Sequence, residues 1–351
     1  MSGDNTRRVI IDTDIGSDID DSWAIAFLLK LHLLSTKGFT EDADHKILTS
    51  QGVLHQPNVE VQMILSCTGN AKYRSELIAQ LLKSANLQKQ IPIGFGAIDE
   101  RNPNLSHPNP LIAMCSHDFF DSYDGIHYED GIRQAVSIIM SNKDYQTNPI
   151  ILLSLGPTTN IDKMLELEPD IKDRVHLIGM YGSFVLGYRG KVGPHAEYNA
   201  KYDVKASRKV FDTKWNKFTI VPLDTCGVFT LSGKPFKKIS GMREDDPIIN
   251  TLLSQYEHWL IERRKKDVQN FFSDINCDKQ STILYDLVTA YVAVRESFLT
   301  FQPLSDLTIS DEGITSAKYE GDDTLRATLK WRDMNGFRDY VTTVLTMKTK
   351  A

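Results

Sequence analysis

Short, almost wholly apolar runs of residues recur along the chain, and segments with helical spacing lie between them. The runs occupy residues 8–12, 59–67, 150–155, 175–180 and 218–223. A strand that is apolar at nearly every position has both faces buried, which is typical of a parallel sheet covered by helices on both sides. Strands that alternate with helices favour right-handed βαβ units. The sequence therefore predicts an α/β fold with an open, mostly parallel, Rossmann-like sheet flanked by helices.

The chain shows no linker or internal repeat, so we expect residues 1–351 to form a single domain. Its 351 residues are 41% hydrophobic and 25% charged, which is ordinary for a globular protein large enough to bury a core without disulfides. Residues 36–57 are polar and irregular, and are interpreted as a surface insertion. Near the other end, Asn335-Gly336 lies between alternating segments, which predicts a C-terminal β-hairpin appendage over residues 322–348.

Residues 246–272 have the apolar spacing of one long amphipathic helix. A run of charged residues, 262–267, lies near the end of this segment. Cations in the last turn of a helix are favoured by the helix dipole. We interpret the run as a solvated helix end rather than as a polyanion site.

Charge and cysteine usage restrict the partners and the compartment. The formal net charge of −6 argues against a nucleic-acid polymer as the main partner, because phosphate binding needs a basic face. The four cysteines form no CxxC pair, which favours reduced thiols in a cytoplasmic protein. The first eight residues are polar, and the longest apolar stretch, residues 24–34, is interrupted by Lys30 and His32. We therefore expect a soluble cytoplasmic protein with no secretory signal and no membrane partner.

The loop after the first predicted strand holds five carboxylates within ten residues: Asp12, Asp14, Asp18, Asp20 and Asp21. In an open α/β sheet, the loop at the carboxyl end of a strand is where ligands bind. Five like charges repel one another, and a divalent cation among them offsets that cost. Carboxylate oxygens select a hard ion, Ca²⁺ or Mg²⁺. The structural alternative is capping of the following helix, but a cap uses one carboxylate rather than five.

Four further motifs follow the acidic loop. Residues 156–160 read GPTTN, residues 179–182 read GMYG, residues 196–199 read AEYN, and Tyr285-Asp286 follows near the end. Together with the acidic loop, these motifs resemble those of the nucleoside hydrolase family of the inosine–uridine-preferring type, in the same order and at comparable spacing. One such motif would be a weak signal, whereas four in the same order are specific. The resemblance covers most of the chain.

The resemblance implies calcium-dependent hydrolysis of the N-glycosidic bond of ribonucleosides, giving free base and ribose, with a place in purine salvage. It implies that Ca²⁺ is held by Asp14, Asp21, the main-chain carbonyl of Thr159, and Asp286. Such an ion lowers the pKa of a bound water and grips ribose hydroxyls. Asp14 is also the implied general base for the attacking water. Asp20 is implied to accept a hydrogen bond from a ribose hydroxyl.

The resemblance also assigns ribose contacts to Asn70, Met180, Glu197 and Asn199. Glu197 and Asn199 have the alternation of two side chains on one face of an extended segment. A buried carboxylate beside the ribose would stabilise developing positive charge. The alternative for Asn70 is an ordinary turn residue, and the alternative for Met180 is a core methionine.

Two positions bear on the leaving base. Tyr285 stands where pyrimidine-accepting members of the family have a histidine, the candidate leaving-group acid. An unperturbed tyrosine titrates at about pH 10 and is a weaker donor than histidine, but its ring can stack on a nucleobase. We therefore take Tyr285 as the second catalytic candidate and expect a preference for purine nucleosides. Lys191 stands where an asparagine that contacts the ribose 5′-hydroxyl is usual. Either this cation accepts a more anionic substituent on the substrate, or the loop is aligned differently in this chain.

Residues 127–131 resemble the family's loop over the pocket. His127 is expected to touch the base and Tyr128 to stack on it. The alternative for His127 is an ordinary surface position, which is the commoner fate of a lone histidine in a loop.

Two other functions stay open from the sequence. A family member that has lost hydrolysis would keep the calcium and ribose contacts as a nucleoside- or ribose-binding module. A haloacid-dehalogenase-like phosphatase also begins with a strand and a DxD motif, but it normally needs Thr or Val where this chain has Gly16. The family resemblance further implies a homo-oligomer, a dimer or a tetramer, that acts on a small-molecule nucleoside.

Overall fold

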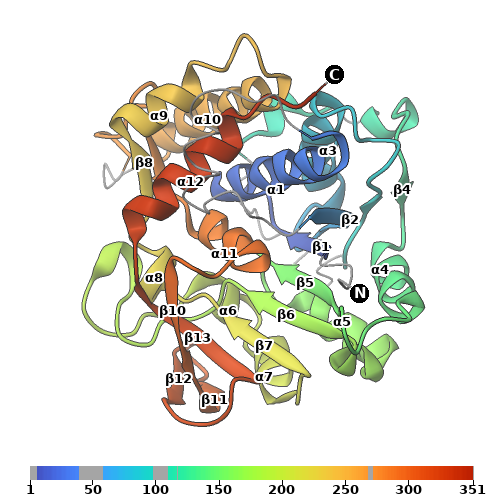
Figure 1. Ribbon diagram of the computed structural model, residues 1–351, viewed down its shortest axis with the longest axis vertical. Helices are drawn as coiled ribbons and strands as arrows, with labels where there is room; N and C mark the ends of the chain where they lie inside the picture. Colours follow the sequence, from blue (N-terminus) through green and yellow to red (C-terminus); the bar gives the residue numbers. More distant parts are fainter. Residues whose placement is uncertain (1–5, 39–57, 98–109, 117, 268–271, 351) are drawn as a thin grey trace.

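The central feature of the protein is a nine-stranded sheet, seen in the computed structural model of Figure 1. The structure describes residues 6–38, 58–97, 110–116, 118–267 and 272–350. The strands lie side by side in the order β10 (Leu299–Pro303), β13 (Leu325–Trp331), β7 (Lys217–Ile220), β6 (Val175–Gly179), β5 (Ile150–Ser154), β1 (Arg7–Thr13), β2 (Val59–Ser66), β3 (Ile93–Gly94) and β4 (His127–Tyr128).

Within this sheet, the neighbouring strands run parallel except for the antiparallel pair β10–β13. The predicted open, mostly parallel sheet is therefore confirmed. Strand β1 lies between β2 and β5, so the chain moves outward to β4 on one side and then returns to continue on the other. Ligands bind at such a switch point, beyond the carboxyl ends of the strands.

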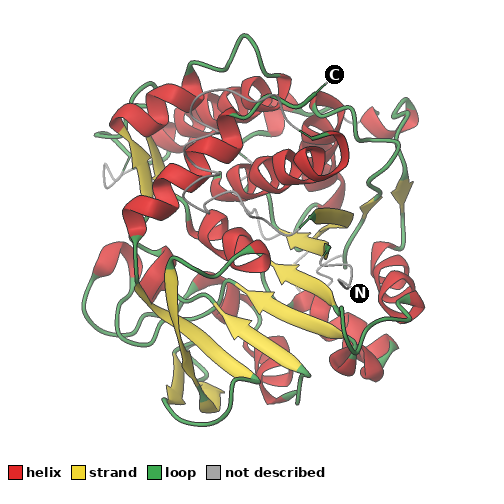
Figure 2. Ribbon diagram, in the orientation of Figure 1, coloured by secondary structure: helices red, strands yellow, loops and turns green. Residues whose placement is uncertain are grey.

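Helices cover both faces of the sheet, because both faces of its strands are apolar (Figures 1 and 2). In β1, Val9 and Ile11 join the hydrophobic cluster on one face, while Ile10 joins the cluster on the other. The first cluster includes residues of α1 (Asp20–Lys37), α3 (Ala71–Ser84), α9 (Gly233–Ser240), α10 (Pro247–Lys265), α11 (Tyr285–Val294) and α12 (Met334–Thr346). The second includes residues of α4 (Gly131–Ser141), α5 (Thr159–Leu167) and α7 (Val204–Asp212).

Helix α1 is buried on all sides from its first residue to Leu33. It packs against α10, α11 and α12. The two polar residues that interrupt its apolar sequence have internal partners. The Lys30 ammonium lies 2.6 Å from a carboxylate oxygen of Asp246 and donates to the main-chain carbonyl of Met347. The His32 ring accepts a hydrogen bond from the backbone N–H of Val61. The stretch is therefore a core helix.

Most of the predicted surface insertion, residues 36–57, lies outside the described residues. The described part of it, residues 36–38, forms the last turn of α1 and its C-cap, Gly38. No helix among the described residues is both long and apolar enough to cross a lipid bilayer.

The predicted hairpin over residues 322–348 is wrong in its position. Asn335 and Gly336 lie in the first turn of α12, where the Asp333 carboxylate accepts a hydrogen bond from the Gly336 N–H at 2.9 Å. The helix buries Phe337, Tyr340, Val341, Val344 and Leu345, which follow helical rather than strand spacing. Antiparallel pairing in the C-terminal part is present elsewhere, between β10 and β13 and in the hairpin of β11 (Ser305–Ile309) and β12 (Thr315–Lys318).

The long helix expected over residues 246–272 is also shorter than predicted. Asp246 caps α10, accepting hydrogen bonds from the N–H groups of Ile248 and Ile249. The helix ends at Lys265, and the Phe272 ring lies edge to face with the Trp259 ring, with 5.3 Å between the centroids.

Candidate active site

A cavity of about 510 Å³ opens at the carboxyl ends of β1, β5 and β6. Its volume is in the usual range for a small-molecule site. It is lined by Asp14, Ser17, Asp18, Asp20, Asp21, Leu155, Met180, Tyr188, Glu197, Tyr198, Asn199, Tyr202, Arg263, Tyr285 and Asp286. The switch point of the sheet therefore carries both the acidic loop and the residues from the later motifs.

Most of the residues predicted from the sequence meet in this cavity. Those that line it are Asp14, Asp20, Asp21, Met180, Glu197, Asn199, Tyr285 and Asp286. Four others do not line it: Asn70, His127, Tyr128 and Thr159.

The acidic loop is held by a buried arginine that the sequence analysis did not identify. Arg74, on α3, donates to the main-chain carbonyls of Asp14, Ile15 and Thr68. Its remaining nitrogen donates to the Ser17 hydroxyl at 2.9 Å. Because the guanidinium contacts the loop backbone, it fixes the loop while its charge offsets part of the nearby negative charge.

Gly16 gives the loop its turn. Its φ of +97° lies in the left-handed region, and a Cβ there would lie 2.7 Å from the Tyr73 hydroxyl and the Leu77 side chain. A residue with a side chain would therefore be both strained and obstructed at this position.

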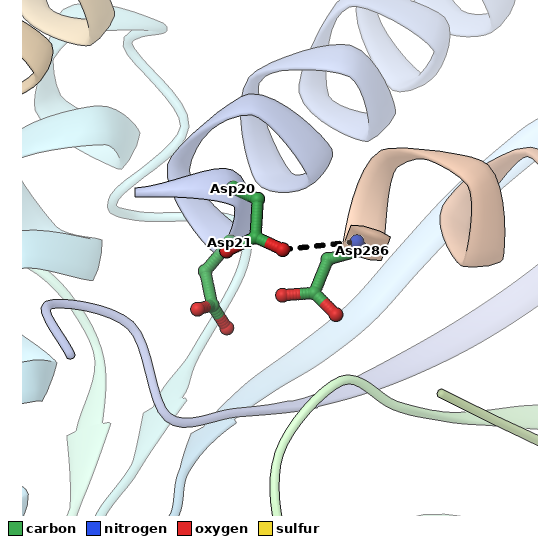
Figure 3. Close-up of side chains that lie close together, drawn as sticks. All are labelled: Asp20, Asp21 and Asp286. Carbon is green, nitrogen blue, oxygen red and sulfur yellow. Dashed lines mark hydrogen bonds between the residues drawn. The ribbon is translucent and has the colours of Figure 1, made fainter. Parts of the chain in front are cut away.

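Three aspartates in the described part of the chain lie close enough together to hold one metal ion (Figure 3). Asp20 and Asp21 begin α1, and Asp286 lies in the first turn of α11. One carboxylate oxygen from each lies within 4.8 Å of the others, and all three residues are buried. Asp20 accepts a hydrogen bond from the Asp286 N–H at 3.2 Å. Two helix N-termini thus bring together carboxylates that are more than 260 residues apart in the chain.

The electrostatics of this cluster suit a hard cation. Burial, and then repulsion between the carboxylates, raises the pKa of Asp20, Asp21 and Asp286 well above the usual range. The donors are all oxygen atoms, which suit Ca²⁺ or Mg²⁺ rather than zinc. Neither Asp20 nor Asp21 is a side-chain cap, since Ile19 holds the N-cap position of α1 and makes no side-chain capping bond. The capping alternative is therefore wrong for these two residues.

Asp12 lies beneath the loop and is not part of the cavity lining. Its carboxylate accepts a hydrogen bond from the Asn160 amide at 2.7 Å, and the same amide nitrogen donates to the main-chain carbonyl of Ser66. Burial raises the pKa of Asp12 to about 7 even though the Asn160 contact lowers it. Asp12 thus joins the ends of β1 and β2 to the start of α5.

Glu197 and Asn199 both line the cavity. The prediction that they lie on an extended segment is wrong, because they belong to the start of a helix. Glu197 is the N-cap of the short helix α6 (Tyr198–Tyr202), and its carboxylate accepts backbone hydrogen bonds from Gly182, Asn199 and Ala200. Burial raises the pKa of Glu197 to about 7, against these three hydrogen bonds.

The Asn199 amide links the ends of two strands. It donates to the main-chain carbonyl of Leu155, after β5, at 2.7 Å and to that of Met180, after β6, at 3.1 Å. Met180 is 4% exposed and lines the cavity, so it is both a core residue and a cavity residue.

Tyr285 is half-buried in the wall of the cavity. Its ring meets the ring of Tyr188 edge to face, with 6.1 Å between the centroids. The Tyr188 hydroxyl accepts a hydrogen bond from the backbone N–H of Tyr198 at 2.8 Å. Burial, followed by the nearby Asp18 and Asp20 carboxylates, raises the pKa of Tyr285 above its usual value. The phenol therefore stays protonated at neutral pH.

Six further lining residues were not predicted as site residues: Ser17, Leu155, Tyr188, Tyr198, Tyr202 and Arg263. Arg263 belongs to the charged run near the end of α10, which we interpreted as solvated. Its guanidinium packs against the rings of Trp259 and Phe272, and its Nε has no hydrogen-bond partner among the described residues. Neighbouring Arg264 and Lys265 are exposed, as expected. The sequence does contain one signal for this position of Arg263: Trp259 and Arg263 are four residues apart, so they lie on the same face of the helix.

The predicted residues outside the cavity have other surroundings. Asn70 is exposed and caps α3 by accepting a hydrogen bond from the Tyr73 N–H, so the turn-residue alternative describes its position. His127 stacks on Phe95 and lies against Phe120, and Tyr128 is 37% exposed. Thr159 is buried at the start of α5, and its hydroxyl has no hydrogen-bond partner among the described residues. Lys191 is exposed and does not line the cavity.

The doubly wound sheet and the buried carboxylate cluster define a class of α/β protein equipped to hold a hard cation against a small polar ligand. A family model described as "Inosine-uridine preferring nucleoside hydrolase" matches residues 9–336. The chain belongs to this family, whose members are N-ribosyl hydrolases.

Individual relatives agree with this assignment. The inosine-uridine preferring nucleoside hydrolase of Leishmania major is 35% identical over 182 residues, which is 48% of this chain and about half, 53%, of that protein. The non-specific ribonucleoside hydrolase RihC of Salmonella paratyphi B is 24% identical over 256 residues, 71% of each chain. A plant nucleoside hydrolase has the same fold, with a TM-score of 0.65 at 19% identity over 97% of this chain and 99% of the other.

Proposed function

We propose that this protein catalyses the calcium-dependent hydrolysis of the N-glycosidic bond of ribonucleosides, releasing free base and ribose, with a preference for purine nucleosides. The observation that carries the proposal is the buried group of Asp20, Asp21 and Asp286 at the edge of a cavity that Tyr285 and Glu197 also line. A hard cation, a ribose and a flat base each have a matching surface there.

The donor set decides which residues would hold the ion. The family resemblance gives Asp14, Asp21, Asp286 and the Thr159 carbonyl, and the geometry of the cluster adds Asp20. When bound, Ca²⁺ supplies a lower pKa for a coordinated water and a grip on ribose hydroxyls.

The carboxylates of the chain would act on both reactants. A water oxygen attacks C1′ while the C1′–N bond breaks, and the bonding electrons leave with the base. Asp14 takes the proton from the water as general base. The transition state has oxocarbenium character, so the negative charges of Glu197 and Asp20 near the sugar stabilise it.

Preference for purines rests on the tyrosines. No histidine lines the cavity among the described residues, and Tyr285 holds its proton because its pKa is raised. A ring stacked on a purine favours binding of that base. The names of the relatives describe an inosine–uridine-preferring enzyme and a non-specific one, so the argument for purines depends on Tyr285 itself.

The test is a comparison of inosine, guanosine, adenosine and uridine as substrates, with calcium or with EDTA, measured by the release of reducing sugar. The proposal predicts release that requires calcium and is faster for the purine nucleosides. Calcium-dependent nucleoside binding without turnover would instead identify the impaired, ribose-binding alternative. Phosphate release from a nucleotide monoester without free ribose would identify the phosphatase.

The remaining expectations follow from the family resemblance and the composition. We propose that the protein is cytoplasmic, serves purine salvage and forms a dimer or a tetramer. Light scattering of the purified chain, coupled to size-exclusion chromatography, measures the oligomeric state directly.

A further inference from the structure

A small β-hairpin over residues 183–195 carries Tyr188 into the wall of the active-site cavity. Its two arms meet at the antiparallel bridge between Leu186 and Val192, and Tyr188 lies in the turn between them. Val192 is 88% exposed, so this part of the hairpin projects into solvent. The hairpin therefore needs anchors of its own to keep Tyr188 in place.

The anchor of the first arm is Asp224, a buried carboxylate on the short helix α8 (Leu223–Cys226). One of its oxygens accepts hydrogen bonds from the backbone N–H groups of Val185 and Leu186, at 2.7 and 3.1 Å. The other oxygen accepts a hydrogen bond from the Phe184 N–H at 2.8 Å. A hydrogen bond to a charged acceptor is roughly twice as strong as one between neutral groups. Three consecutive N–H groups of the hairpin are therefore held by one side chain.

Helix α8 is itself held by the core of the protein. The Leu223 N–H donates to the Gly182 carbonyl at 3.0 Å. The Thr225 hydroxyl lies 2.7 Å from the hydroxyl of Thr328 on β13. Asp224 does not line the cavity, so any effect it has on a bound ligand must pass through the hairpin.

At the other end of this series of contacts, Tyr188 reaches the place expected for the nucleobase. Its ring lies 6.1 Å from the Tyr285 ring, with 81° between the two planes. The Tyr188 hydroxyl accepts a hydrogen bond from the Tyr198 N–H. A flat base stacked on Tyr285 is therefore nearly perpendicular to the Tyr188 ring, and the two rings form a corner for the base.

We propose that Asp224 is a positioning residue of the active site: by holding the first arm of the hairpin, it keeps Tyr188 beside Tyr285 and so aligns the nucleobase. This inference rests on the proposed function, because Tyr188 has a base to meet only if the ligand is a nucleoside. Asp224 does not touch the ligand, since it is outside the cavity lining. Its contribution to catalysis must therefore depend on the presence of Tyr188.

A double-mutant cycle tests this dependence, measured as kcat/KM for inosine in the presence of calcium. Tyr188→Ala removes the ring, and we expect kcat/KM to fall by about fivefold. Asp224→Ala removes the acceptor of all three N–H groups, and we expect a fall of similar size because the ring is no longer held. The double variant should then resemble either single variant, whereas losses that multiply would overturn the proposal.

Two further variants separate positioning from a general loss of structure. Asp224→Asn keeps the oxygen that faces Val185 and Leu186, so we expect it to stay within about threefold of the wild-type kcat/KM. Asp333→Ala is the matched control, because it removes a carboxylate that accepts a backbone N–H at the start of α12, and it should leave kcat/KM unchanged. A loss in the asparagine variant as large as in the alanine variant, or an equal loss in the Asp333 variant, contradicts the proposal.

Hydrogen exchange followed by mass spectrometry tests the anchor without turnover. In Asp224→Ala, we expect peptides from residues 183–195 to exchange at least about tenfold faster, with no change in β1 and β5. An unchanged hairpin, or a uniform rise along the whole chain, overturns the proposal. Asp224→Leu keeps the bulk of the side chain without its acceptors, and takes the place of the alanine variant if that variant does not fold.

The two proposals fail in different ways. If the wild-type chain hydrolyses inosine but the losses in the cycle multiply, the positioning role of Asp224 is wrong and the proposed function stands. If the wild-type chain hydrolyses no nucleoside, the proposed function fails and the alignment of the base fails with it. The exchange measurement then still decides whether Asp224 holds the hairpin.

Discussion

Asp14 is the residue on which the proposed chemistry depends most directly. Asp14→Asn replaces the proton acceptor with an amide of nearly the same shape, and we expect turnover of inosine to fall by at least about a hundredfold. The release of reducing sugar measures this. Asp311→Asn, which changes an exposed carboxylate far from the cavity lining, is the control and should leave turnover unchanged. Near-normal activity of the Asp14 variant would show that another group accepts the proton.

Tyr285 separates stacking from proton donation. Tyr285→Ala removes the ring, and we expect it to raise the KM for inosine and to lower kcat, so that kcat/KM falls by about tenfold, because a stacked aromatic pair contributes about 1 kcal/mol and aligns the base. Tyr285→Phe keeps the ring and removes the hydroxyl, so it should retain most of the activity. Steady-state kinetics on both variants checks this, and an equal loss in the phenylalanine variant would assign the effect to the hydroxyl.

At this scale the sequence identifies acidic residues better than it identifies the tyrosines. Carboxylates crowded into one short loop repel one another unless a cation lies among them, so Asp14, Asp20 and Asp21 could be predicted as residues of a cation site from the sequence. Tyr188 and Arg263 could not, because a tyrosine in a loop and an arginine near a helix end are common in any protein. Whether such a residue reaches a cavity depends on how its segment packs.

At the scale of single elements, the buried ion pair of α1 has a measurable role. The side chains of Lys30 and Asp246 are 3% and 11% exposed, and the pair joins α1 to the start of α10. Lys30→Met leaves the Asp246 carboxylate buried without its counter-charge, so we expect the free energy of unfolding to fall by about 3 kcal/mol.

Urea unfolding measures the effect of Lys30→Met. The control is Arg133→Met, which breaks an exposed pair with Asp130 and should cost less than about 1 kcal/mol. Similar losses in both variants would mean that the buried pair does not stabilise the junction of the two helices.

The C-terminal helix shows why one element was predicted wrongly. Asn-Gly is a strong hairpin signal when strands flank it, but here Asp333 stands three residues before Gly336 and caps a helix. Phe337, Tyr340 and Val344 continue with helical spacing. The helical period of these apolar residues extends over more of the segment than the local Asn-Gly turn signal, and it is the longer pattern that corresponds to the structure.

For the whole molecule, the buried carboxyls make stability depend on both pH and calcium. Burial raises the pKa of Asp12 and Glu197 to about 7, and that of the cluster carboxyls well above its usual range. Between about pH 4 and pH 7, the folded chain therefore binds protons that the unfolded chain has released. This contribution to stability is present at low pH and is lost as the pH rises through the folded values, by up to about 1.4 kcal/mol per pH unit for each group.

We accordingly expect the free energy of unfolding in EDTA to be higher at pH 5.5 than at pH 7.5. Calcium neutralises the cluster, so added calcium should stabilise the protein more at pH 7.5 than at pH 5.5. Urea unfolding at the two pH values, with EDTA or with calcium, gives the four required numbers. The same urea unfolding with magnesium in place of calcium compares how strongly the two ions stabilise the protein. An identical calcium effect at both pH values would show that the ion does not bind at the carboxylates.

The general architecture was the most predictable part of the protein. Buried parallel strands must be apolar on both faces, so β1, β5 and β6 could be recognised from their continuous apolar runs in the sequence. The meeting of Asp21 with Asp286 could not be derived from spacing and was implied only by the family resemblance, because a contact between residues so far apart is decided by the order of the strands. The resemblance gave Asp20 as a ribose contact, and its place in the same cluster came from the structure.

The position of β1 at the middle of the sheet has a consequence for how such a protein can change over time. The reacting groups gather around the central strands, while β4 and β10 end the sheet on either side. New segments can therefore be added at the two margins without displacing the carboxylates. A fragment that stops before α11 would lack Asp286, one of the three carboxylates of the cation cluster, so the site needs segments from both ends of the sequence.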